Sequence, residues 1–93
     1  MADLPADDPF VTMASAHIDL ANGQAADRPR ELVAAAILHA AARYNAFTGM
    51  GLARSSSELA ALRDDFIEDQ VAQFRDALAH HYQGYIAELD AQG

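Results

Sequence analysis

The segment from residue 32 to residue 47 constrains the fold more than any other part of the chain. Apolar residues recur there at steps of four and three, at Val33, Ile37, Ala40, Tyr44 and Phe47. This spacing is typical of one face of an α-helix that packs against other helices. Alanine fills much of the remaining segment, so neighbouring helices can approach closely. The pattern indicates a helical bundle and points to no particular chemistry.

Start and stop signals divide the chain into three predicted helices, at about residues 9–22, 28–48 and 56–90. Each predicted start has a capping side chain or a proline suited to a first turn: Asp8 with Pro9, Asp27 with Pro29, and Ser55 with Glu58 as a capping box. Each predicted stop between helices has residues that favour a turn: Asn22-Gly23 as a left-handed stop, and Gly49 with Gly51. We predict an all-α fold, an up-down-up three-helix bundle with a long C-terminal helix. Residues 1–8 are expected to form a flexible acidic tail and residues 9–91 a single domain.

Charge and composition exclude several classes of partner. Fourteen acidic and six basic residues give a net charge of −8, and the six arginines form no cluster. Such a chain repels phosphate backbones, so no nucleic-acid partner is expected, and no polybasic segment predicts binding to a membrane surface. The N-terminus has no basic flank or apolar run of the kind found in secretory signals. The expected location is cytoplasmic.

The lengths of the predicted helices indicate self-association. At 1.5 Å per residue the second helix spans about 30 Å and the third about 50 Å, so the third must extend beyond the second. Large apolar side chains lie in this extension: Leu78, Tyr82, Tyr85, Ile86 and Leu89. They are the predicted interface of a homodimer. The alternative is a break at Gly84 that folds the last turns back over the first helix.

Arg43 and Asn45 flank Tyr44 and are the candidate ligand-binding residues of the second helix. The favoured interpretation is structural, because a buried arginine or asparagine needs polar partners. Arg43 is then expected to pair with an acid of the third helix such as Asp64, and Asn45 to hydrogen-bond between helices. The alternative is an anion or carboxylate ligand held by Arg43.

Acidic residues at helical spacing on the third helix raise the possibility of a metal site. They form two pairs four residues apart, Asp64 with Glu68 and Asp65 with Asp69. The Glu-x-x-His signature of di-iron bundles is absent, and a solvated acidic face is the favoured interpretation. No metal and no cofactor are expected. His17 and His39 are interpreted as residues at the edge of a core, and the adjacent His80 and His81 as one surface and one half-buried position.

Two segments of the chain resemble a known family. They are Leu20-Ala21-Asn22 and, further along, Ala40-Ala41-Ala42-Arg43-Tyr44-Asn45-Ala46-Phe47. This pattern resembles that of a small proteobacterial family catalogued only as a domain of unknown function, in which phenylalanine is more frequent at the position of Tyr44. The resemblance implies an all-helical fold over most of residues 10–89 and carries no activity.

No set of serine, histidine and acid with suitable spacing predicts nucleophilic catalysis, so an enzyme is not expected. The sequence favours a non-catalytic interaction or assembly module that forms a homodimer. The alternative is a small-molecule (anion) or metal-binding protein that uses Arg43, Asn45 or the acidic face of the third helix.

Overall fold

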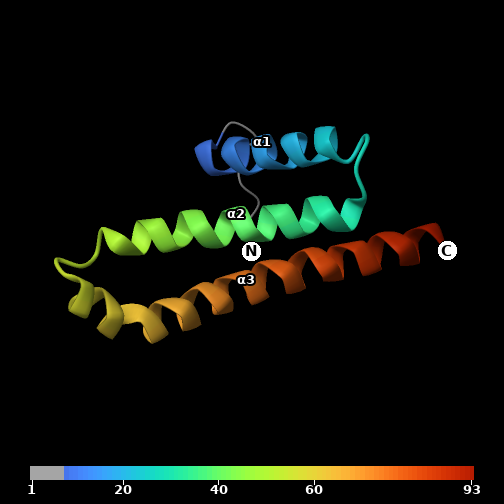
Figure 1. Cartoon of the computed structure of the whole chain (residues 1–93). Helices are drawn as coiled ribbons and strands as arrows, with labels where there is room; N and C mark the ends of the chain where they lie inside the picture. Colours follow the sequence, from blue (N-terminus) through green and yellow to red (C-terminus); the bar gives the residue numbers. More distant parts are fainter. Residues whose placement is uncertain (1–7) are drawn as a thin grey trace. The chain divides into compact units, whose positions relative to one another are not determined.

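The computed structural model describes residues 8–93, which fold into three α-helices (Figure 1). The helices are α1 (Pro9–Gln24), α2 (Arg30–Met50) and α3 (Ser56–Gln92). This part of the chain contains no β-strand. The predicted all-α fold with three helices and a long third helix is confirmed. Apart from Asp8, the predicted acidic tail lies outside the described residues.

The chain divides into two compact units, residues 1–46 and 47–93. The described part of the first unit holds α1 and most of α2. The second unit holds the end of α2, the connection at residues 51–55 and all of α3. The predicted up-down-up arrangement and the single domain stay predictions.

Two helices begin as the sequence predicts. The Asp8 carboxylate accepts a hydrogen bond from the Phe10 amide at 2.8 Å, and Pro9 occupies the first turn of α1. The Ser55 hydroxyl accepts a hydrogen bond from the Glu58 amide at 3.1 Å, which is the serine half of the predicted capping box. Both side chains satisfy amides that a helix start leaves without a partner.

The predicted left-handed stop at Asn22-Gly23 is wrong. α1 continues to Gln24, and no described glycine or other residue has a positive φ. The Ala25 amide still donates to the Ala21 carbonyl at 2.9 Å, and the Ala26 amide then donates to the Gly23 carbonyl at 3.4 Å. The helix therefore ends by tightening into three-residue turns, which need no left-handed residue.

The second helix begins two residues later than predicted, at Arg30. The Pro29 carbonyl accepts the first hydrogen bonds of the helix, from the Leu32 amide at 3.1 Å and the Val33 amide at 3.2 Å. Asp27 lies before this turn, and its carboxylate pairs with Arg28 at 3.3 Å. The end of α2 lies between its two glycines, as predicted.

Burial is slight in the described residues. Val33 is the one buried apolar side chain among them, at 7% exposure. Other members of the predicted packing face are open to solvent, because Ile37 is 43% exposed and Tyr44 is 66% exposed. The closely packed face predicted for the second helix is therefore confirmed at Val33 and wrong at Ile37 and Tyr44.

α3 is continuous through Gly84, so the predicted alternative of a break at this residue is wrong. Its 37 residues span about 56 Å, against about 32 Å for the 21 residues of α2. Within residues 8–93, no helix combines the length and apolar character needed to cross a membrane.

Candidate functional site

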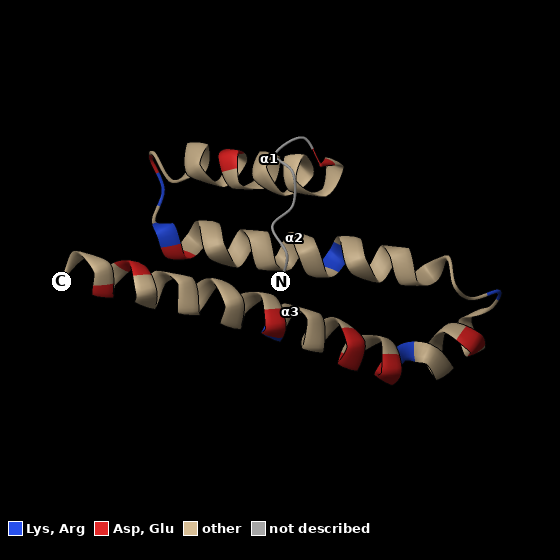
Figure 2. Ribbon diagram, turned by 180° about the vertical axis from the view of Figure 1, so that it is seen from behind, with Lys and Arg blue, Asp and Glu red and all other residues tan. Residues whose placement is uncertain are grey.

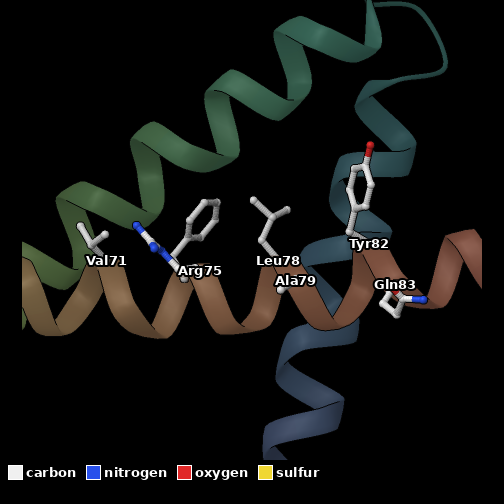
Figure 3. Close-up of a pocket in the computed structure, with 7 residues that line it drawn as sticks. Val71, Arg75, Leu78, Ala79, Tyr82 and Gln83 are labelled. Carbon is white, nitrogen blue, oxygen red and sulfur yellow. The ribbon is translucent and has the colours of Figure 1, made fainter.

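The functional candidate is a continuous row of apolar side chains along α3. We call it the α3 stripe, and its members are Ile67, Val71, Phe74, Leu78, Tyr82, Tyr85 and Leu89. Their spacing of three and four residues places all seven within an arc of about 80° around the helix axis. Figure 3 shows Val71, Leu78 and Tyr82 extending from the same side of α3.

Every member of the α3 stripe is substantially exposed. The fractions run from 44% at Ile67 to 68% at Tyr82, and Leu78 at the middle of the stripe is 52% exposed. Scattered exposed apolar residues are normal on protein surfaces, but seven in one row form a continuous apolar patch. Patches of this kind mark interaction surfaces for proteins or membranes, or ligand-binding grooves.

The structure places four of the five predicted interface residues in the α3 stripe, and the fifth, Ile86, on its flank at 41% exposure. The predicted interface leaves out Ile67, Val71 and Phe74, because it contains only residues in the expected extension of the third helix beyond the second. Ile67, Val71 and Phe74 lie eleven, seven and four residues before Leu78, a helical spacing that could have added them to the predicted surface.

A different face of α3 serves packing inside the second unit. Leu59, Leu62 and Phe66 lie about 130° around the helix from the centre of the α3 stripe. Of these, Leu59 and Phe66 are half-buried, and the Phe66 ring lies against Gly49 near the end of α2. The face of α3 that contacts the end of α2 is therefore a different face from the α3 stripe.

Polar residues border the stripe without converting it into a ligand pocket. The polar Arg75 and Gln83 line a surface hollow together with Ala79 and stripe residues, and all the lining residues belong to α3 (Figure 3). Pockets for small molecules are concave and bury most of the ligand surface. A hollow lined by a single helix is too open for that, so the α3 stripe suits a protein segment better than a small molecule.

Arg43 and Asn45, the predicted ligand-binding residues, are both exposed on α2. Neither lines the hollows on α3. Within residues 8–93 the arginine ion pairs are Arg28 with Asp27 and Arg63 with Asp64, the latter at 2.6 Å. The expected partner of Arg43 lies in the other unit, so that pairing and the anion site stay predictions.

The acidic residues of α3 are distributed along its length, as Figure 2 shows, and they are exposed. Asp64 pairs with Arg63, and the Gln73 amide donates to the Asp69 carboxylate at 2.9 Å. Among the described residues, no three histidine, aspartate or glutamate side chains come together in a way that would hold a metal ion.

All four histidines are exposed. The His80 and His81 rings meet edge to face with their centroids 5.1 Å apart. The positions at the edge of a core predicted for His17 and His39 are therefore wrong, and so is the half-buried position predicted for one of His80 and His81.

The chain matches the family described as Protein of unknown function (DUF3144) over residues 10–86. It belongs to this family. The DUF3144 match includes α1, α2 and all of the α3 stripe except Leu89. Curated proteins and solved structures yield no match to the chain. The resemblance to a domain of unknown function is confirmed, and the proteobacterial origin stays a prediction.

Proposed function

We propose that this DUF3144 protein is a non-catalytic assembly module whose two copies form a homodimer through the α3 stripe. One observation carries the proposal: seven large apolar side chains lie in one row on α3, each between 44% and 68% exposed. A second copy supplies an apolar surface of the same length and width. A two-fold contact between identical surfaces is also the commonest way in which soluble proteins self-associate.

The area of the α3 stripe supports a dimer of modest size. A fully buried aromatic side chain covers about 150 to 250 Å² and a fully buried aliphatic one about 60 to 120 Å². At the observed exposures the stripe therefore offers about 550 Å² per chain, or about 1,100 Å² for a pair. Specific interfaces begin at about 1,000 Å², and the flanking Ile86 adds to the total.

The lengths of the helices also support the proposal. α2 has 21 residues and α3 has 37, so α2 is 16 residues shorter, a difference of about 24 Å. α2 therefore cannot cover α3 along its full length. The small size of the chain also favours a dimer. A domain of 93 residues has little interior of its own, and burial against a second copy stabilises both chains.

The test compares two variants of α3 by light scattering with the wild type. Tyr85→Glu places a charge in the α3 stripe, whereas Ala87→Glu adds the same charge two residues away on the opposite side of the helix. We expect a dimeric wild type, a dimeric Ala87→Glu variant and a monomeric Tyr85→Glu variant. A monomeric wild type would refute the dimer. A Tyr85→Glu variant that stays dimeric at micromolar concentration would refute this surface.

A further inference from the structure

The α3 stripe has the same spacing in both directions from Leu78. Ile67 lies eleven residues before Leu78 and Leu89 eleven residues after it. Val71 and Tyr85 lie seven residues away on either side. Phe74 and Tyr82, the remaining members, lie four residues away on either side.

This symmetry has a consequence for pairing between two copies. In an antiparallel helix pair, a residue before the centre lies level with the residue equally far after the centre on the other helix. A pair centred on Leu78 therefore brings every member of the stripe against another member. The row contains no position at which an apolar side chain would meet a polar one.

The stripe also suits a long contact between nearly straight helices. Its positions repeat every eleven residues, from Ile67 to Leu78 to Leu89, which corresponds to about 3.67 residues per turn. This value is close to the 3.6 residues of a straight α-helix. Two such helices can therefore stay in contact over the 23 residues from Ile67 to Leu89, which span about 33 Å.

Charge favours the antiparallel over the parallel orientation. Residues 58–69 carry five acidic side chains and one arginine, a net side-chain charge of −4. Residues 87–93 carry Glu88 and Asp90, a net charge of −2. A parallel pair places the −4 segments level with each other, whereas an antiparallel pair places each −4 segment level with a −2 segment. The helix dipoles also favour opposite directions.

We infer that the homodimer is an antiparallel α3–α3 pair centred on Leu78, in which Val71 lies level with Tyr85 of the partner subunit. This inference rests on the proposed function and adds the orientation and register of the same surface. It excludes a parallel pair, in which each residue lies beside its own copy.

The chain contains no cysteine, so single cysteines report the register without background. The variants are Leu78→Cys, Val71→Cys and Tyr85→Cys in the full chain, each first checked for dimer formation by light scattering and then treated with a short bis-maleimide. We expect Leu78→Cys to cross-link to itself. Val71→Cys alone stays uncross-linked, because its two copies lie 14 residues apart along the pair, or about 21 Å. An equimolar mixture of Val71→Cys and Tyr85→Cys gives a mixed dimer that mass spectrometry identifies.

Other results overturn the inference in distinguishable ways. Self-cross-linking of both Val71→Cys and Tyr85→Cys, each alone, would show a parallel pair and leave the homodimer intact. Dimeric variants that never cross-link would place the interface elsewhere. A monomeric wild type in light scattering would refute the proposed function itself, whatever the cysteines show.

Discussion

Gly49 lies directly against the ring of Phe66: a Cβ atom added to Gly49 would lie 3.2 Å from Phe66 Cζ. This contact joins the last turn of α2 to the third turn of α3 within the second unit. It also fixes which face of α3 is turned toward α2 at this point. The α3 stripe begins one residue later, at Ile67, on a different face.

The surroundings of Gly84 and Gly49 predict different effects on stability when each glycine is replaced by alanine. Gly84→Ala should stabilise the protein by about 1 kcal/mol and raise the melting temperature by about 4 to 8 °C, because the helix gains an alanine and no atom lies within 4 Å of the new Cβ. Gly49→Ala should lack this gain or lower stability, because its Cβ meets the Phe66 ring. Thermal unfolding followed by circular dichroism measures both.

A third variant distinguishes the contact from other effects at Gly49. Combining Gly49→Ala with Phe66→Leu should remove the clash, so the double variant should be more stable than the sum of the single changes predicts. If the stability change of the double variant equals the sum of the two single changes, the contact between Gly49 and Phe66 is contradicted.

Removal of metal should leave the protein unchanged. Within residues 8–93 no cluster of metal-ligating side chains is present, so no bound metal is expected to stabilise this part of the fold. We expect the same melting temperature with and without a strong chelator. Elemental analysis that finds about one zinc, iron or manganese per chain after exhaustive dialysis would contradict this prediction.

Added salt should strengthen the dimer. Each chain carries a net charge of −8, so two copies repel each other, whereas the α3 stripe is apolar. Raising sodium chloride from about 0.01 M to about 1 M shortens the screening length from about 30 Å to about 3 Å and weakens this repulsion. We expect the dissociation constant from sedimentation equilibrium to fall. A constant that rises with salt would indicate an interface held by ion pairs.

Local chemistry explains which parts of the fold the sequence predicts well. Asp8 and Ser55 cap helix starts, because the oxygen of each side chain accepts a hydrogen bond from a backbone amide two or three residues later. The stop at Asn22-Gly23 fails for a related reason. Glycine permits a left-handed residue but does not require one, and the Ala25 amide finds the Ala21 carbonyl without it.

Burial is harder to predict, because it depends on which element lies opposite a face. The spacing of Val33, Ile37 and Tyr44 shows correctly that they lie near one side of a helix, but of these only Val33 is buried in the described structure. On α3 the spacing identifies the apolar residues without showing which of them pack inside the second unit. The contact between Phe66 and Gly49 supplies that information, and it makes the α3 stripe the candidate surface.

The molecular mass of the wild-type protein in solution tests the central claim most directly. Multi-angle light scattering across a range of concentrations, from about 1 μM to about 1 mM, should show a rise from the 10.0 kDa of one chain to twice that mass. A mass that stays at 10.0 kDa over the whole range would contradict a dimer built on the α3 stripe.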